Sequence, residues 1–215
     1  MQKLRFSYET IEIGDVDIHI CSLRDNQQFY DPEGTAEALG ISSAVWPLFG
    51  VLWPSSRALA TLMCDYDVGD RRILEIGCGL GLASLVLNQR GANITATDYH
   101  PSVEAFMEVN TTLNGAPPIP FERTSWADGD DSLGRFDLII ASDVLYERGE
   151  EVALADFIDR HANTTCEVIV ADPKRGQANR FGRQMESRGF TFTRREASEG
   201  DQPKPYNGLI LTFLR

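Results

Sequence analysis

Residues 73–81 read Ile-Leu-Glu-Ile-Gly-Cys-Gly-Leu-Gly, and residues 95–98 read Thr-Ala-Thr-Asp. The first stretch is an apolar run that enters a turn of alternating glycines and is followed by a helical pattern. The second is a strand-like run that ends on a carboxylate. In an open parallel sheet, this order holds a nucleoside-like ligand at the carboxyl ends of the strands. We expect the glycines to remove side chains where a ligand approaches backbone, and Asp98 to accept hydrogen bonds from ribose hydroxyls.

The spacing of the glycines distinguishes between two ligands. A dinucleotide fingerprint has the pattern G-x-G-x-x-G, but position 82 is Leu, so the pattern here is G-x-G-x-G. Pyrophosphate binding uses a close helix amino terminus, whereas S-adenosylmethionine has no phosphate and tolerates a looser turn. The carboxylate of Glu75 can help to balance the positive charges of the ammonium and sulfonium groups of S-adenosylmethionine. The pattern therefore favours S-adenosylmethionine over NAD, with an ordinary strand-to-helix turn of an α/β domain as the non-functional alternative.

Composition limits the classes of partner. The chain has 215 residues and a net charge of −12. This charge argues against a general nucleic-acid binder, which needs cations against phosphate, and it is compatible with a basic, lysine-bearing protein surface. The four cysteines show neither paired spacing nor a metal-ligand pattern, so we expect no metal and a reducing compartment. No apolar run approaches the ~20 residues of a membrane helix, and no signal peptide is recognisable. We therefore expect a cytoplasmic protein that does not enter a membrane.

The hydrophobic pattern predicts an α/β fold. Residues 4–20 alternate as in a hairpin, and residues 21–45 read as a loop with a short helical piece near residue 35. From residue 71, strands and helices alternate, which is typical of a Rossmann-like, doubly wound, mostly parallel sheet. The last two strands have no helix between them and should pair antiparallel. We predict an extension at 1–45 and a ligand-binding domain at 46–215. The expected strands are 72–76, 93–97, 119–124, 136–142, 168–171, 190–194 and 208–214, and the expected helices are 54–64, 81–89, 102–113, 150–161 and 177–188.

Four stretches resemble one protein family. They are the aromatic segment 46–53 with the helix start at 54–60, the glycine turn through Asp98, the pair Ser125-Trp126, and residues 142–147, Ser-Asp-Val-Leu-Tyr-Glu. Together they resemble the class I, seven-β-strand S-adenosylmethionine-dependent methyltransferases. More narrowly, they resemble the lysine methyltransferases of family 16, near the branch that modifies the β-subunit of electron transfer flavoprotein. The motif Asp143-x-x-Tyr146 is the most diagnostic of the four.

The resemblance implies a role for each matching residue. Asp143 and Tyr146 are the expected catalytic residues, in the loop where methyltransferases of this class hold the target nitrogen. The expected cofactor contacts are the backbone of Gly77, Cys78 and Gly79 at the methionine moiety, Asp98 at the ribose, Trp126 and Ser142 at the adenine, and Trp53 beside the cationic sulfur. Each has a purely structural alternative. Trp53 can be a core aromatic residue, Asp143 can cap a turn, and Tyr146 can pack.

The expected reaction is in-line methyl transfer to a protein lysine, accelerated mainly by positioning. A lysine amine costs roughly 4–5 kcal/mol to deprotonate at pH 7, and Asp143 favours its ammonium form. Asp143 is therefore expected to orient the nitrogen, and we assign no general base. The residues also leave open a small-molecule amine or a histidine as acceptor, an NAD-type oxidoreductase, and a cofactor-binding scaffold without turnover.

Overall fold

A seven-stranded sheet forms the centre of the molecule. The computed structural model describes residues 4–127, 129, 131–146, 149–197 and 206–215. The sheet has the order β5-β4-β3-β6-β7-β9-β8. Strands β3 to β7 run parallel, whereas β9 lies antiparallel to both β7 and β8. The bounds are β3 (Arg72–Ile76), β4 (Asn93–Asp98), β5 (Phe121–Arg123), β6 (Phe136–Ser142), β7 (Ala162–Asp172), β8 (Thr191–Glu196) and β9 (Leu209–Leu214). The predicted fold class is confirmed.

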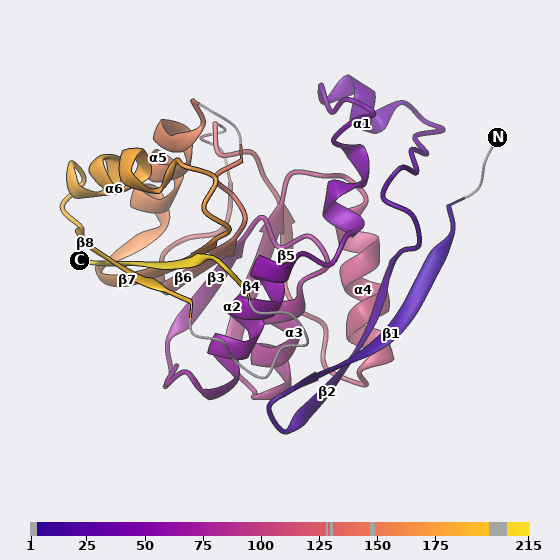
Figure 1. Ribbon diagram of the computed structural model, residues 1–215, viewed down its shortest axis with the longest axis horizontal. Coiled ribbons are helices and arrows are strands. Elements are labelled where there is room, and N and C mark those ends of the chain that lie inside the picture. Colours follow the sequence, from indigo (N-terminus) through magenta and orange to yellow (C-terminus); the bar gives the residue numbers. More distant parts are fainter. Residues whose placement is uncertain (1–3, 128, 130, 147–148, 198–205) are drawn as a thin grey trace.

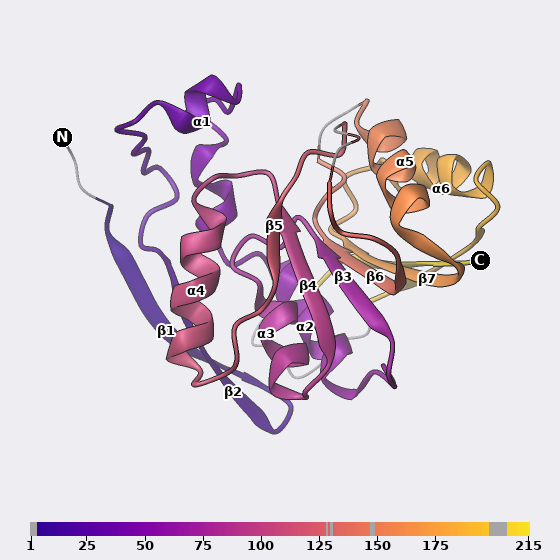
Figure 2. The ribbon, with the colours of Figure 1, turned by 180° about the vertical axis from the view of Figure 1, so that it is seen from behind.

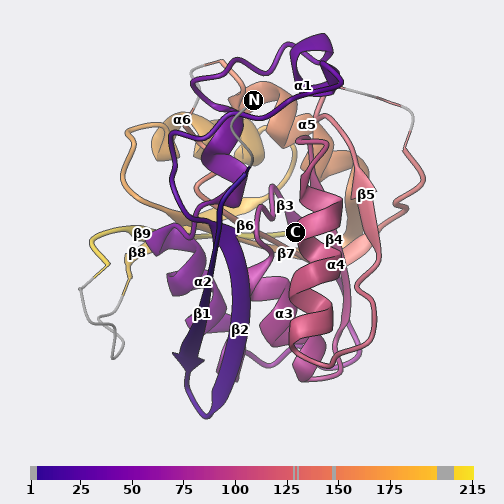
Figure 3. The same cartoon turned by 90° about the vertical axis from the view of Figure 1, so that its right-hand side faces the viewer.

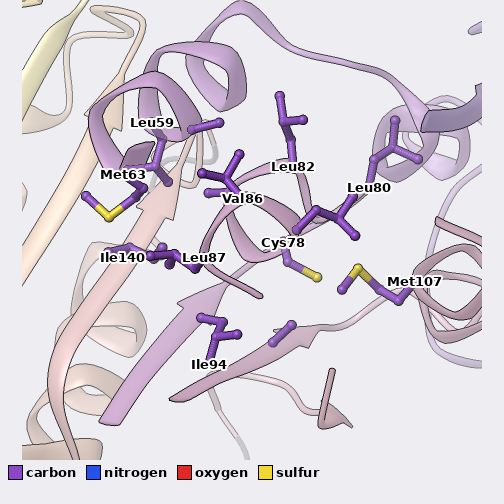
Figure 4. Packing of buried hydrophobic residues seen from close by; sticks show 14 of the residues in the cluster. Leu59, Met63, Cys78, Leu80, Leu82, Val86, Leu87, Ile94, Met107 and Ile140 are labelled. Atoms are coloured by element: carbon purple, nitrogen blue, oxygen red, sulfur yellow. The ribbon is translucent and has the colours of Figure 1, made fainter. Parts of the chain in front are cut away.

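Helices cover both faces of this sheet (Figures 1 and 2). On one face lie α2 (Pro54–Asp65), α3 (Leu82–Gln89) and α4 (Val103–Leu113), and on the other lie α5 (Glu151–His161) and α6 (Ala178–Glu186). The central strands are apolar on both sides, so each supplies two hydrophobic clusters. In β3, for example, Ile73 packs with the first cluster and Leu74 with the second. Figure 4 shows the first cluster, where Leu59 of α2, Val86 of α3 and Met107 of α4 are labelled.

A two-stranded hairpin precedes the sheet domain. Strands β1 (Phe6–Ile13) and β2 (Val16–Leu23) pair antiparallel, and β2 runs along α3 and α4 (Figure 3). The isoleucines Ile11, Ile13, Ile18 and Ile20 are buried in the same cluster as α2 and α3. The hairpin therefore shares a hydrophobic core with the sheet. A short helix α1 (Thr35–Ala38) and a 3-10 helix η1 (Trp46–Gly50) connect it to α2.

Several local features differ from the sequence prediction. Strand β2 continues to Leu23, where a loop was predicted from residue 21, and β5 covers only Phe121–Arg123 of the predicted strand 119–124. Strand β7 begins at Ala162, directly after α5, although only residues 168–171 were predicted as strand. Its first half is polar and has no apolar alternation, but it is held by backbone pairing, as where Cys166 exchanges hydrogen bonds with Arg215. The 3-10 helix η1 was not predicted either. It buries Trp46 and Phe49, which the sequence pattern showed only as an aromatic segment.

Asn110 links the hairpin to the glycine turn. Its side chain is fully buried in α4. Its Oδ1 accepts a hydrogen bond from the Cys21 backbone N–H at 2.7 Å, and its Nδ2 donates to the Leu80 carbonyl at 3.2 Å. One side chain therefore satisfies a backbone group in β2 and another in the turn.

Asn110→Leu is expected to lower the free energy of unfolding by about 2–4 kcal/mol, because it leaves two buried backbone groups unpaired at about 1–3 kcal/mol each. Urea unfolding followed by circular dichroism measures this. Asn114→Leu is the matched control, since Asn114 bonds the His19 backbone in an exposed position where water can replace it. Equal losses for the two variants would contradict the importance of burial.

Candidate functional site

The carboxyl ends of β3, β4 and β6 open onto a cavity of about 670 Å³. Its lining includes the loops that follow these strands, the segment 39–41 before η1, and η1 itself. Nine of the ten site residues predicted from the sequence line it: Trp53, Gly77, Cys78, Gly79, Asp98, Trp126, Ser142, Asp143 and Tyr146. A second hollow of about 650 Å³ lies on the hairpin and contains none of these residues. The chemistry-bearing motifs thus converge on one cavity.

The glycine turn is required by backbone geometry. Gly77 and Gly79 have φ angles of 61° and 52°, in the left-handed region that side chains disfavour. A Cβ on Gly79 would lie 2.9 Å from the Phe49 carbonyl oxygen, and one on Gly77 would lie 2.9 Å from Val144 Cγ1. The bare backbone therefore admits close packing of η1 and of the loop after β6, while it also lines the cavity.

Asp98 ends β4 beside this turn. Its Oδ2 accepts a hydrogen bond from the Gly79 N–H at 2.9 Å, and its Oδ1 accepts one from the His100 N–H at 2.9 Å. Burial raises the pKa of this carboxyl. Each oxygen retains a further lone pair for a donor in the cavity.

Glu75 occupies a different position from the one expected. It is buried and does not line the cavity. Its Oε2 accepts hydrogen bonds from the Ser84 backbone N–H at 2.9 Å and from the Ser84 hydroxyl. Side chains alternate along a strand, so Glu75 shares a face with Ile73 and points at α3. Its direct contact is with the first turns of that helix.

Burial raises the pKa of Glu75 to about 7. The folded carboxyl therefore keeps its proton to a higher pH than the unfolded one, which titrates near 4.3. The resulting stabilisation is complete below the unfolded pKa and is lost as the pH rises towards 7.

Glu75→Gln keeps an acceptor for Ser84 but cannot ionise. Relative to the wild type, its free energy of unfolding is expected to rise by about 2–3 kcal/mol between pH 4.5 and 8, at about 1.4 kcal/mol per pH unit. Urea unfolding at several pH values measures the difference. The exposed Glu12→Gln variant serves as control. A difference that does not change with pH would show that folding does not raise the pKa of Glu75.

An aromatic group forms the wall on the η1 side. Trp53 is half-buried and its Nε1 donates to the Leu48 carbonyl at 3.0 Å. Trp46 is only 1% exposed and lies behind the wall. His100 stacks on Phe49 with ring centroids 4.1 Å apart, and burial lowers its pKa to about 4. The ring is therefore neutral at pH 7.

His100 and Phe49 also line the cavity, and the sequence pattern predicts a role for neither of them. Tyr99 and Arg175 also line it, and the hydroxyl of Tyr99 donates to the carbonyl of Leu39, directly after α1, at 2.8 Å. Tyr99, His100 and Arg175 follow the carboxyl ends of β4 and β7, which was the signal available for them, whereas nothing local in the sequence points to Phe49.

The opposite wall carries Asp143 and Tyr146, in the loop after β6. Asp143 has a φ of 56°, and its backbone N–H donates to the Ala171 carbonyl at 2.9 Å. The side chain of Tyr146 is largely exposed, at 51%. The last residue of the matching motif, Glu147, lies outside the described residues. Asp143 also contacts Arg175, with the guanidinium Nε 2.5 Å from Oδ1 and Nη2 2.8 Å from Oδ2.

The strand order, the reversed β9 and the glycine turn define the class I methyltransferase fold. Two examples illustrate the similarity of the chain to solved structures with this fold. The ribosomal protein L11 methylase of Lactobacillus delbrueckii has a TM-score of 0.64 at 21% identity, over 97% of this chain and 99% of that one. The magnesium protoporphyrin IX methyltransferase of Synechocystis, solved with bound SAM, has a TM-score of 0.57 at 20% identity, over 75% and 77%.

The chain belongs to the lysine methyltransferase family, whose profile matches residues 35–188. The predicted family is confirmed. Among curated relatives, the electron transfer flavoprotein beta subunit lysine methyltransferase of Xenopus laevis is 27% identical over 135 residues, covering 61% of this chain and 54% of the relative. The chain spans about half the length of the curated relatives it matches.

Within the described residues, no helix is long and apolar enough to cross a membrane.

Proposed function

We propose that this protein is an S-adenosylmethionine-dependent N-methyltransferase that methylates a lysine side chain of another protein. The observation that carries the proposal is that one cavity joins the glycine turn and Asp98 to Asp143 and Tyr146. A nucleoside donor and an amine acceptor need such a shared space, because the reacting atoms must be held in line. The family membership and the names of the relatives support the same activity.

The residues present fit the donor. The glycine turn leaves backbone bare where a Cβ has no room, and Asp98 offers carboxylate lone pairs at the position expected for a ribose. We propose that Trp126 and Ser142 hold the adenine and that Trp53 flanks the methionine side. When bound, S-adenosylmethionine supplies a methyl group whose bond to sulfur breaks, with its electron pair going to sulfur, as the amine lone pair forms the new carbon–nitrogen bond.

On the acceptor side, the amine must lose a proton to water before it can act as a nucleophile. Asp143 is proposed to orient the nitrogen, and it stabilises the ammonium that carries the new methyl group. We propose that the nitrogen of the bound acceptor lies between Tyr146 and Trp53, where the loss of water contacts favours the neutral amine. We assign Glu75 a structural role, since its carboxyl contacts Ser84.

The partner is proposed to be a protein with a basic, lysine-bearing surface. The net charge of −12 supports this choice and disfavours nucleic acid. The four free cysteines support a reducing compartment such as the cytoplasm as the place of action.

Two measurements test the proposal. Calorimetry should detect binding of S-adenosylhomocysteine, with no comparable binding of NAD. Incubation with methyl-labelled S-adenosylmethionine and a lysate from cells that lack the protein should then label a discrete protein band, in which mass spectrometry finds methyllysine. Tight NAD binding without S-adenosylhomocysteine binding would overturn the proposal. Label confined to small molecules would move the acceptor to a free amine, and methylhistidine would move it to histidine.

A further inference from the structure

The ion pair between Asp143 and Arg175 is unusual for its position. Asp143 is the residue expected to meet the cationic substrate, yet both of its carboxylate oxygens are held by one guanidinium. The side chain of Asp143 is 10% exposed and that of Arg175 is 41% exposed. Paired Arg–carboxylate contacts of this kind fix geometry as well as charge.

The backbone around this pair is strained on both sides. Among the described residues, Asp143 and Lys174 are the two non-glycine positions with positive φ, at 56° and 64°. Asp172, at the end of β7, accepts a hydrogen bond from the Lys174 N–H at 2.9 Å. The two loops are thus held so that Arg175 reaches Asp143, and strain retained in this way is typical of functional segments.

Arg175 is also the lone lysine or arginine among the described residues that line the cavity. Among the described residues, Asp172 and Tyr206 act electrostatically on the pair, and Tyr146 and Glu150 line the same cavity. Burial raises the pKa values of Asp172 and Tyr206, which disfavours further negative charge there. His100, across the cavity, is neutral at pH 7. Among the described residues that line the cavity, Arg175 is therefore the cation that offsets the negative charge of Asp143.

Methyl transfer poses a conflict at this point. The amine must be neutral to react, but an unpaired carboxylate within about 4–6 Å would raise the pKa of the amine by about 1–3 units. We propose that Arg175 is a positioning residue that neutralises Asp143, so that the carboxylate orients the target nitrogen without holding it as an ammonium. The inference rests on the proposed methyltransferase function. The proton leaves the ammonium for water, and both Arg175 and Asp143 keep their charges.

Arg175→Gln tests this role through the pH dependence of kcat, which reports groups in the substrate complex. With the electron transfer flavoprotein β-subunit as probe acceptor, the rising limb of the profile of kcat against pH should shift to higher pH by about one unit. At pH values below this limb, kcat should be about tenfold lower than in the wild type, and it should recover at higher pH. The KM should also be lower than in the wild type. Lys174→Gln removes the same charge one residue earlier, where Nζ contacts Glu196 and Asn207, and should leave the limb in place. Arg175→Lys should restore most of the wild-type profile.

A second readout needs no methyl transfer. In the presence of S-adenosylhomocysteine at pH 7, n-butylammonium followed by NMR titration should bind about tenfold more tightly to Arg175→Gln than to the wild type or to Lys174→Gln. The inference would be overturned if Arg175→Gln bound butylammonium with the affinity of the wild type. It would also be overturned if the profile of kcat against pH did not shift, or if kcat fell by the same factor at every pH. If the wild type transfers no methyl group, the proposed function fails on this acceptor, and the butylammonium comparison still decides the role of Arg175.

Discussion

Asp98→Ala is expected to weaken binding of S-adenosylhomocysteine by at least about a hundredfold. A hydrogen bond to a charged group contributes about 1.5–3 kcal/mol, and the carboxylate of Asp98 is positioned to accept two from a ribose. The same change leaves the backbone N–H groups of Gly79 and His100 without their acceptor, so the turn loses the contact that fixes its shape. Isothermal titration calorimetry measures the change in Kd.

Asp137→Ala is the matched control for this experiment. Asp137 also accepts a backbone N–H, that of Arg72 at 3.0 Å, as well as the Asn163 amide at 2.6 Å. It lies at the amino-terminal end of β6, away from the cavity, so its removal can cost stability but should leave the Kd within about threefold. If Asp98→Ala binds S-adenosylhomocysteine as the wild type does, the assignment of the ribose site is wrong.

Asp143→Ala is expected to lower kcat by about 10²–10³-fold while the affinity for S-adenosylhomocysteine stays nearly constant. Loss of the orienting carboxylate misplaces the target nitrogen, and an error of about 1 Å can cost about a hundredfold in rate. The guanidinium of Arg175 is then left unneutralised in the cavity, and it repels an incoming ammonium. Methyl transfer in single turnovers, measured beside calorimetry, separates the two effects.

Asp156→Ala provides the comparison, because Asp156 also pairs with an arginine, Arg188, through two contacts. That pair lies on α5 and near the end of α6, so its loss should leave kcat within about twofold. The double variant Asp143→Ala, Arg175→Gln should regain part of the lost activity, since it removes the uncompensated cation. An Asp143→Ala enzyme as active as the parent would reject the catalytic assignment.

The order of elements could be predicted because each strand carries its own signal. Strands β3 and β6 have the predicted bounds, since an apolar run between polar or glycine residues is a local pattern. The fold then places the carboxyl ends of all parallel strands at one edge, which is why eight of the nine predicted residues line one cavity, and Trp53 reaches it from the segment before α2. The polar half of β7 escaped prediction because pairing with neighbouring strands, and not composition, holds it extended.

Glu75 was assigned to the ligand although the twofold alternation of β3 indicated otherwise. Ile73 packs against the α2 and α3 side, so the residue two positions later must share that face. The alternation of side chains along β3 therefore already indicated, from the sequence, which way Glu75 points. The sequence contained no such signal for His100. The ring that stacks on it belongs to Phe49 in η1, and the position of η1 depends on the packing of the whole first hydrophobic cluster.

The chain by itself determined the class of fold, the glycine turn and the place of each motif relative to a strand end, because these follow from the short-range spacing of apolar residues and glycines. Only the tertiary structure decided which charges meet. Asp143 and Arg175 are 32 residues apart and follow two parallel neighbours, β6 and β7. Their contact depends on the register of those strands and on two left-handed backbone turns, and side-chain pairing of this kind has no local signature in sequence.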